Sequence, residues 1–241
     1  ICACLVGSEM CIRDRNIIRE MNPIGGNIYV KGRKISDFTS KEYAKTMSVV
    51  LTEKIKTEMM TCRDVVAMGR YPYTNYFGRL TKEDEVIVNE SLKKVSALDI
   101  AENDFSQISD GQRQRIMLAR AICQKPEVIV LDEPTAMLDP NGRKEVLRAV
   151  RKLNEEKGVT VILITHYMEE VVFADRVFVM DNGKLVMQGT PREIFSEVEK
   201  LKELRLDVPQ VTLLAYELRK NGVDLPEGIL TIEELVNALC H

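Results

Sequence analysis

Two adjacent carboxylates follow a short apolar segment near the middle of the chain. The run Val128–Leu131 is uninterrupted, and it leads directly into Asp132 and Glu133, then Pro134. Such a run predicts a strand buried on both faces of a parallel sheet, and open α/β sheets place ligands beyond the carboxyl ends of their strands. Packing gives no reason for two acidic side chains there. A strand end that simply faces solvent is the alternative. We expect the two carboxylates to take part in a chemical reaction.

The tetrapeptide Ser109-Asp110-Gly111-Gln112 opens a predicted helix. A helix N-terminus presents unpaired N–H groups and a partial positive charge, which suit an anion. Gly111 lets the backbone approach a phosphate closely, Ser109 can donate its hydroxyl to a phosphate oxygen, and two arginines follow at once. The alternative is an ordinary Ser/Asp cap before a surface helix.

A second apolar segment, Val159–Ile164, is interrupted only by Thr160 and is followed by Thr165 and His166. His166 is the only histidine before the last residue and stands at a predicted strand tip, so we expect it to join the two carboxylates. A structural hydrogen bond is the alternative role for an isolated histidine. Asp139 begins a further helix, and the two tasks of capping that helix and serving a site are compatible.

The elements that must position these residues alternate between strand and helix, which predicts an α/β fold with a parallel sheet. Helical spacing dominates residues 58–125, where Pro72 is expected to end a helix. Further along, Asp181-Asn182-Gly183 predicts a hairpin turn. Two short helices are expected within 196–241, the second beginning with a Thr231…Glu234 capping box.

Composition excludes several classes of protein. The 241 residues carry a net charge of −3 and only 5% aromatic residues, with no Trp, so we expect no nucleic-acid partner. No apolar run approaches the ~20 residues that span a bilayer, so a membrane role would require a partner. The six cysteines are interpreted as reduced thiols; Cys2-x-Cys4 could be a metal fragment, but no downstream residues complete a pattern.

Residues 1–15 look foreign to the rest of the chain. The stretch from Cys4 to Arg15 resembles translated sequencing-adapter read-through, and it has neither the basic leader nor the long apolar region of a signal peptide. We expect a non-native segment at 1–15, an incomplete catalytic domain at 16–195 and a helical appendage at 196–241.

Taken in this order and spacing, the segments Ile108–Gln112, Val128–Glu133, Leu138-Asp139 and His166 resemble the ATP-binding subunit of an ABC (ATP-binding cassette) transporter. The resemblance implies a P-loop NTPase-like parallel sheet with a helical signature subdomain near 58–125, truncated at the N-terminus. It also implies ATP and Mg²⁺ as cofactors.

The resemblance assigns a role to each candidate residue. Asp132 would hold Mg²⁺, and Glu133 would orient and deprotonate the attacking water. His166 would bond the γ-phosphate and report hydrolysis. Residues 109–112 would contact ATP held by the opposite subunit of a head-to-tail dimer, and Asp139 matches the loop that couples the subunits.

Two departures from the family pattern stand out. The chain contains no G-x-x-x-x-G-K-[ST] loop, whose backbone and Lys supply most contacts to the β- and γ-phosphates. Where the family has a glutamine after the strand Ser48–Leu51, this chain has Thr52-Glu53; Thr52 could still bind the metal. We therefore expect no tight ATP binding in the chain's own site, while its signature helix could complete the site of a partner. We also expect marginal stability, because loss of a central strand leaves an unpaired edge.

The resemblance has two parts. Residues 45–130 are similar to the ATPases of ferric-siderophore importers, and residues 131–239 to the energy-coupling factor ATPases of vitamin and metal-ion importers. The change falls within Leu131–Thr135, which many ABC ATPases share. A chimera joined there is one hypothesis, and ordinary divergence within one subfamily is the other.

These observations predict an importer ATPase that energises solute uptake from the cytoplasmic face of the membrane. Its expected partners are transmembrane permease subunits and a second ABC ATPase subunit, in a homodimer or heterodimer. A degenerate, non-hydrolytic subunit of a heterodimer is the second interpretation. A non-transport ABC protein is the third, but its long coiled-coil insertion or tandem cassettes are not present in this sequence.

Overall fold

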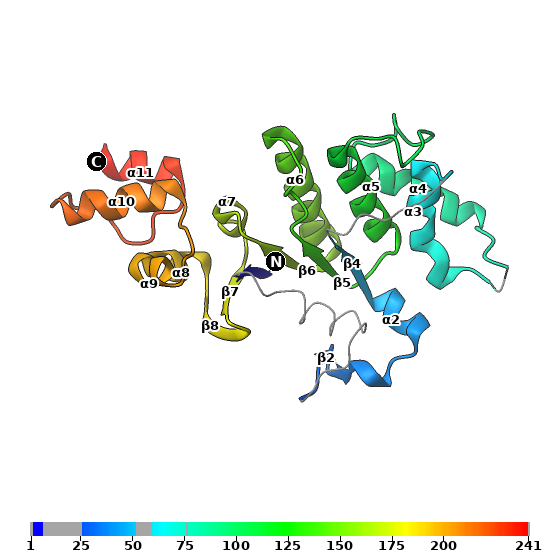
Figure 1. Ribbon diagram of the computed structural model, residues 1–241, viewed down its shortest axis with the longest axis horizontal. Coiled ribbons are helices and arrows are strands. Elements are labelled where there is room, and N and C mark those ends of the chain that lie inside the picture. The colour runs from blue at the N-terminus through cyan, green and yellow to red at the C-terminus, as the bar shows by residue number, and fades with distance from the viewer. Residues whose placement is uncertain (1, 7–25, 52–58, 76, 241) are drawn as a thin grey trace. The chain divides into compact units, whose positions relative to one another are not determined.

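The computed structural model describes residues 2–6, 26–51, 59–75 and 77–240. These residues form two compact units (Figure 1). The amino-terminal unit comprises residues 15–162, and the carboxyl-terminal unit comprises residues 163–241 together with residues 1–14. The boundary falls inside strand β6 (Thr160–Thr165). The predicted division into domains, with an appendage that begins at residue 196, remains a prediction.

Parallel strands form the centre of the amino-terminal unit. Strand β4 (Met47–Val50) pairs in parallel with β5 (Val128–Asp132), and β5 lies between β4 and β6. The middle residues of β5 are almost fully buried, as the uninterrupted apolar run predicts. The backbone N–H of Glu127 donates to the carbonyl of Thr46 (2.9 Å), and Thr160 N–H donates to the carbonyl of Glu127 (2.9 Å). These bonds align the starts of β4, β5 and β6.

Helices α5 (Asp110–Cys123) and α6 (Pro140–Lys157) begin where the sequence predicts. Ser109 is the N-cap of α5, and Asp139 is the N-cap of α6, followed by Pro140 in the first turn. Gly158 ends α6 in the left-handed conformation, with φ 63°. The expected N-caps at Ser109 and Asp139 are therefore confirmed, and they fix the entry of the chain into both helices.

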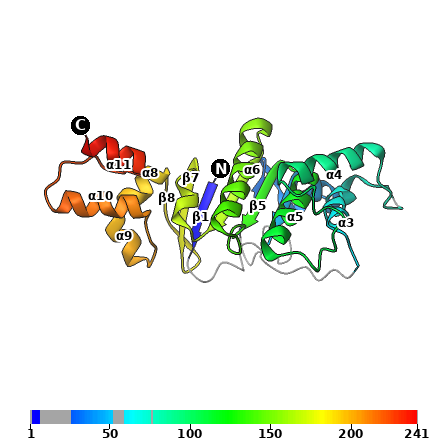
Figure 2. The same ribbon diagram turned by 90° about the horizontal axis from the view of Figure 1, so that it is seen from above.

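The region predicted to be helical contains α3 (Cys62–Ala67), the 3-10 helix η2 (Met68–Tyr73) and α4 (Lys82–Lys94), which pack on α5 (Figures 1 and 2). The expectation that Pro72 ends a helix is wrong in detail. The α-helix ends at Ala67, and the chain continues through Pro72 as a 3-10 helix. This tighter helix keeps the chain against α5.

Gly69 and a buried ion pair fix this packing. A Cβ at Gly69 would collide with the backbone carbonyl oxygen of Arg120 in α5. Beside it, Arg70 Nε donates to Asp84 Oδ1 at 2.8 Å, and both side chains are less than a tenth exposed. Arg70 also donates to the Cys123 carbonyl oxygen at 2.9 Å. Three helical segments therefore meet at one guanidinium group.

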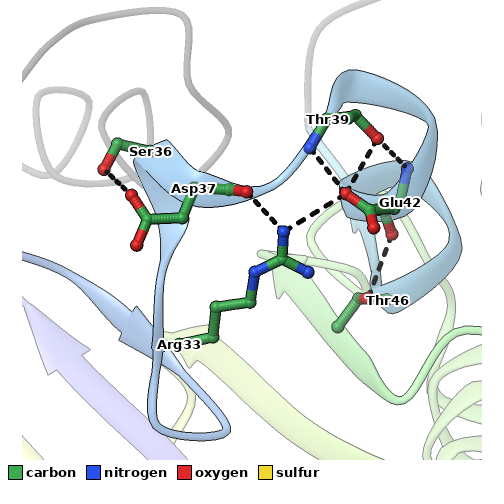
Figure 3. A network of polar contacts seen from close by, with 6 residues as sticks. All are labelled: Arg33, Ser36, Asp37, Thr39, Glu42 and Thr46. Atoms are coloured by element: carbon green, nitrogen blue, oxygen red, sulfur yellow. Dashed lines mark hydrogen bonds and ion pairs between the residues drawn. The ribbon is translucent and has the colours of Figure 1, made fainter.

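The start of the amino-terminal unit is an antiparallel hairpin of β2 (Tyr29–Val30) and β3 (Arg33–Lys34), followed by η1 (Ile35–Asp37) and α2 (Ser40–Thr46). The turn residues Lys31 and Gly32 both have positive φ, as a two-residue type I′ hairpin turn requires. Figure 3 shows how Arg33 joins the hairpin to α2 through Glu42 and the Asp37 carbonyl. The N–H and hydroxyl of Thr39, assisted by Arg33, hold the pKa of Glu42 below its ordinary value.

The carboxyl-terminal unit contains β1 (Cys2–Val6), β7 (Arg176–Asp181) and β8 (Lys184–Gly189). Asn182 and Gly183 both have positive φ between the antiparallel strands β7 and β8, which confirms the predicted hairpin turn. Strand β1 pairs in parallel with β7, in register from Cys2 with Arg176 to Val6 with Met180. Part of the segment 1–15, which the sequence analysis expects to be non-native, thus joins the sheet. Its non-native origin remains a prediction.

Helices fill the rest of this unit (Figure 1). They are α7 (Met168–Val171), α8 (Pro191–Ser196), α9 (Val198–Glu203), α10 (Gln210–Lys220) and α11 (Ile232–Leu239). The sequence predicts only two of the tail helices, α10 and α11, because α8 and α9 each contain only six residues. Ala215, Leu225, Ile229 and Leu235 form a small buried cluster between α10 and α11.

Across the described ranges, no helix combines the length and the apolar character needed to cross a membrane. Cys2, Cys62, Cys123 and Cys240 are free thiols. Burial, opposed in part by a hydrogen bond with Ser91, raises the pKa of Cys123 to about 11. This thiol is therefore protonated and unreactive near neutral pH.

Candidate functional site

The start of α5 is held by a reciprocal pair of hydrogen bonds. The Gln112 backbone N–H donates to Ser109 Oγ at 3.2 Å, and the Ser109 N–H donates to Gln112 Oε1 at 3.0 Å. This capping box occupies two of the N–H groups at the helix end. The hydroxyl proton of Ser109 is the part of its side chain that could bond an anion. The plain capping role that the sequence leaves open is therefore real, and it leaves a donor for a phosphate.

Two arginines flank this helix start. Arg113 pairs with Asp110 at 2.8 Å, and Arg115 donates to the Ser96 carbonyl oxygen at 3.1 Å and lies 3.5 Å from Glu145 of α6. Arg115 thus helps to hold α5 against α6 and the segment at Ser96, whereas Arg113 pairs within α5 itself. The positive field at the start of α5 remains, but the arginines are not idle anion ligands.

The carboxylates occupy the tip of β5, as predicted. Asp132 is the last residue of the strand, and Glu133 follows it with φ 44°, in the left-handed region that non-glycine residues rarely enter. Such a conformation costs about 1–3 kcal/mol and clusters at functional sites. Both side chains are half-buried. The chain then turns tightly, with the Ala136 N–H donating to the Glu133 carbonyl at 3.2 Å.

This turn brings two of the predicted motifs together. The Leu138 N–H donates to the Thr135 carbonyl at 3.0 Å, and Leu138 Cδ2 lies 3.1 Å from the position a Cβ would take at Gly111. The next residue, Asp139, accepts from the Gly142 N–H at 3.1 Å to cap α6. The start of α5 and the cap of α6 therefore share the Leu138 side chain as their contact.

His166 belongs to the carboxyl-terminal unit, immediately after β6. Its side chain is exposed, and its ring lies 4.2 Å from the ring of Tyr167, tilted by 34°. The predicted meeting of His166 with Glu133 thus joins residues of different units and remains a prediction. Thr52, the possible metal ligand after β4, lies outside the described residues.

Asp132 is suited to a magnesium ion that arrives with its nucleotide. Within the described parts of the chain, no three His, Cys, Asp or Glu side chains form a cluster that could hold a metal. Mg²⁺ usually takes only one or two protein carboxylates and fills its remaining positions with water and substrate phosphates. A single carboxylate at a strand tip fits that pattern.

Two further residues escaped the sequence analysis. Leu138 was noted only as part of a motif, yet it is the contact between two helix starts. Glu170 is buried, with an exposed fraction of 3%, and accepts a hydrogen bond from Thr165 beside His166. A glutamate in a short helix gives no local signal of burial, so only the fold reveals it.

The chain is similar to proteins of a known family. Residues 15–136 match the family described as ABC transporter. The energy-coupling factor transporter ATP-binding protein EcfA1 of Caldanaerobacter subterraneus subsp. tengcongensis is 46% identical over 221 residues, which is 91% of this chain and 78% of that protein. The chain belongs to the ABC transporter ATPase family. Residues 211–241 also match the EcfA1 C-terminal domain.

Solved ABC structures agree with this assignment. The cbiO1 protein from Clostridium perfringens, part of the ABC transporter complex cbiONQ, is 25% identical with a TM-score of 0.70, and the match covers 90% of this chain and 86% of that one. The dimeric ATP-binding cassette MJ0796, bound to ADP and Pi, is 26% identical with a TM-score of 0.68, and the match covers 79% of this chain and 84% of that one. The predicted ABC fold and the energy-coupling factor resemblance are confirmed.

The alignment with EcfA1 extends over both parts of the chain that the sequence analysis distinguished. The similarity of residues 45–130 to siderophore importer ATPases and the proposed chimera at Leu131–Thr135 remain hypotheses.

Proposed function

We propose that the chain is the ATP-binding subunit of an energy-coupling factor importer, and that it energises solute uptake at the cytoplasmic face of the membrane. The observation that carries the proposal is the shared contact at Leu138. It places the anion-suited start of α5 next to Asp139 of α6, as a subunit would need if both motifs meet a nucleotide on a partner. The similarity to EcfA1 proteins supports it.

The proposed partners are transmembrane permease subunits and a second ABC ATPase subunit. A signature helix can contact a nucleotide only if that nucleotide is bound elsewhere, so the arrangement calls for a head-to-tail pair. The dimeric state of the MJ0796 cassette supports a pair of this kind. The partner must carry a phosphate loop of its own. This requirement decides whether the second subunit can be identical to the chain or must be a different ABC ATPase.

Each candidate residue then has a task on the bound nucleotide. The hydroxyl of Ser109 and the backbone at Gly111 would bond the γ-phosphate of the partner's ATP. In the chain's own site, Asp132 would hold Mg²⁺, Glu133 would accept the proton of the attacking water and His166 would bond the γ-phosphate. Bound Mg²⁺ supplies positive charge to the phosphates.

We further propose that the 241-residue polypeptide binds ATP only weakly by itself. It contains no G-x-x-x-x-G-K-[ST] loop, and such a loop supplies the amide nest and Lys that hold the β- and γ-phosphates. The second candidate function follows from the same sequence: a non-hydrolytic subunit that completes the site of an intact partner. The intact cap of α5 favours it, because that half of a site needs no phosphate loop of its own.

A mixing experiment tests both ideas. The polypeptide is mixed with an intact energy-coupling factor ATPase, and ATP hydrolysis is followed with and without membrane subunits. We expect stimulation by the parent chain and loss of about 10-fold or more of it in Ser109→Arg, which fills the space of the phosphate. Gln107→Arg, two residues earlier and exposed, adds the same charge and should keep the stimulation.

Nucleotide binding by the isolated polypeptide separates the two candidates. Equilibrium dialysis with ATP and Mg²⁺ should give a dissociation constant weaker than about 1 mM. A dissociation constant of that size corresponds to a binding free energy of about −4 kcal/mol. Tight binding would contradict the weak-site proposal. Absence of both binding and stimulation would contradict the partner-completing role.

A further inference from the structure

The loop between β6 and α7 is closed by three hydrogen bonds. The Thr165 hydroxyl donates to Glu170 Oε2 at 2.8 Å, and the Tyr167 N–H donates to Thr165 Oγ1 at 3.0 Å. The Glu170 N–H in turn donates to the Tyr167 carbonyl oxygen at 3.1 Å. Thr165, Tyr167 and Glu170 therefore form a closed ring of hydrogen bonds. His166 lies between Thr165 and Tyr167 in the sequence.

Two residues of the hydrogen-bonded ring are buried, whereas the imidazole of His166 is exposed. Thr165 and Glu170 have exposed fractions of 2% and 3%, whereas His166 is exposed. Burying a carboxyl group is costly unless hydrogen bonds satisfy it, and an apolar side chain of similar size would fill the same volume more cheaply. Packing alone therefore does not explain the glutamate, whose carboxylate accepts a hydrogen bond at the strand end.

The direction of each bond is fixed by chemistry. A backbone N–H can only donate, so Thr165 Oγ1 must accept from Tyr167, and the hydroxyl proton is then available for Glu170. The backbone is tied down on both sides of His166, by β6 before it and by the ring after it. The tilted ring contact with Tyr167 narrows the orientations of the imidazole further.

We propose that Glu170 and Thr165 are positioning residues for His166. They hold the strand-to-helix turn and thereby limit the orientations that the exposed imidazole can take. This inference rests on the proposed function only for what the imidazole meets, which is a phosphate oxygen. The positioning itself is a property of the chain without nucleotide.

The chain offers a clean spectroscopic test, because His166 and His241 are its only histidines. The protein is labelled with ¹⁵N-histidine in a His241→Gln background, so every imidazole signal comes from His166. Spectra are recorded without nucleotide for the parent, Glu170→Ala, Thr165→Val and Thr165→Ser. Glu169→Gln, which alters the exposed neighbour of Glu170, is the matched control, and circular dichroism verifies that each variant is folded.

The parent and Glu169→Gln should each give one narrow set of His166 imidazole signals. Glu170→Ala and Thr165→Val should give a second set, or lines broadened about twofold or more by exchange. Thr165→Ser keeps the hydroxyl and should restore the parent spectrum. A near-isosteric Thr165→Val that folds yet leaves the lines unchanged overturns the proposal, as does a parent whose signals are already broadened.

If Glu170→Ala does not fold, the comparison of Thr165→Val with Thr165→Ser decides the question. The result is independent of ATP hydrolysis. A failed mixing experiment with narrow His166 lines would count against the proposed function alone, and normal stimulation with unchanged lines in Thr165→Val would count against the positioning role alone.

Discussion

The helical subdomain of α3, η2, α4 and α5 and the tail of α10 and α11 are both small helical assemblies, but they are held together differently. In the subdomain, the backbone of Gly69 approaches the backbone of Arg120, and a buried Arg70–Asp84 pair joins three segments. In the tail, four buried apolar residues and one buried hydrogen bond, from the Thr212 hydroxyl to the Ile229 carbonyl oxygen, supply the contact, and the Arg192–Glu234 ion pair is partly exposed to solvent.

This difference teaches where each assembly is vulnerable. The subdomain depends on polar and backbone contacts that tolerate almost no change of shape, so a single substitution should disturb the whole amino-terminal unit. The tail depends on a few apolar side chains, so a substitution there should open only the tail. A subdomain that must present its signature helix to a partner benefits from the first arrangement.

The largest effect is expected from Asp84→Ala. It leaves the Arg70 guanidinium buried without its carboxylate, and breaking a buried pair in this way costs about 3–5 kcal/mol. Urea denaturation followed by circular dichroism should show the loss in the free energy of unfolding. Glu83→Ala, at the exposed neighbouring position, should change it by less than about 0.5 kcal/mol. Equal effects of the two variants would contradict the structural role of the pair.

Acid should weaken the subdomain through the same carboxyl group. Burial by itself raises the pKa of Asp84. Hydrogen bonds from Thr81 and Arg70, together with the charge of Arg70, lower the pKa by more than burial raises it, so the net pKa lies below the ordinary value. Its contribution is therefore fully present above the unfolded pKa of about 3.9 and is lost as pH falls through the folded pKa. Asp84→Asn should lose less stability on acidification than the parent, measured by urea midpoints from pH 6 down to about pH 2.

In the tail, Ile229→Ala should lower the free energy of unfolding by about 2–5 kcal/mol. The Ile229 side chain packs in the small apolar cluster with an exposed fraction of only 2%. Amide hydrogen exchange should accelerate throughout α10 and α11 and stay unchanged in α5. The control is Val236→Ala, where the side chain is half exposed. Faster exchange in α5 would show that the tail and the subdomain unfold together, against the contrast drawn above.

Two glycines sharpen the contrast between rigid and yielding contacts. Gly69→Ala should destabilise the protein by about 1–3 kcal/mol, since the obstacle is a backbone carbonyl. At Gly111 the obstacle is the end of the Leu138 side chain, 3.1 Å from the new Cβ, which can rotate away. Thermal melting should therefore place Gly111→Ala closer to the parent. The reverse order would mean that the approach of η2 to α5 is looser than the structure indicates.

The smallest effect is expected at the start of α11. The Thr231 hydroxyl accepts from the Glu234 N–H at 3.2 Å, and loss of such a cap costs about 1 kcal/mol. Thr231→Ala should lower protection of the first α11 amides by that amount in hydrogen exchange, whereas Thr231→Ser keeps the cap. If the serine variant loses as much as the alanine variant, the hydroxyl is not what holds the helix end.

Features with local causes were predictable from the sequence. The caps at Ser109 and Asp139 and the hairpin at Asn182-Gly183 each follow from a few neighbouring residues, and the structure confirms them. The capping box predicted at Thr231 is only half formed. Glu234 accepts from the Leu230 N–H at 2.8 Å rather than closing the box on Thr231, a shift of one residue that the sequence pattern cannot resolve.

Features that join distant segments were not predictable. Arg70 and Asp84 are 14 positions apart on different helices, and no period relates them. The same holds for Leu138 against Gly111 and for Gln124, whose side chain bonds Ser48 Oγ at 3.1 Å across the start of β4. Among the candidate site residues, the sequence found the strand tips and the helix starts. It could not find the side chains that hold them, because these are fixed only when elements pack.

The pairing of β1 with β7 has a consequence for strand complementation. The ladder from Cys2 to Val6 is formed by backbone groups, so β7 could pair with another short apolar strand that keeps a small residue in place of Ala3, which is fully buried in the apolar core of this unit. A synthetic pentapeptide of this kind should therefore compete for the edge of β7, as a donor strand does in pilus assembly.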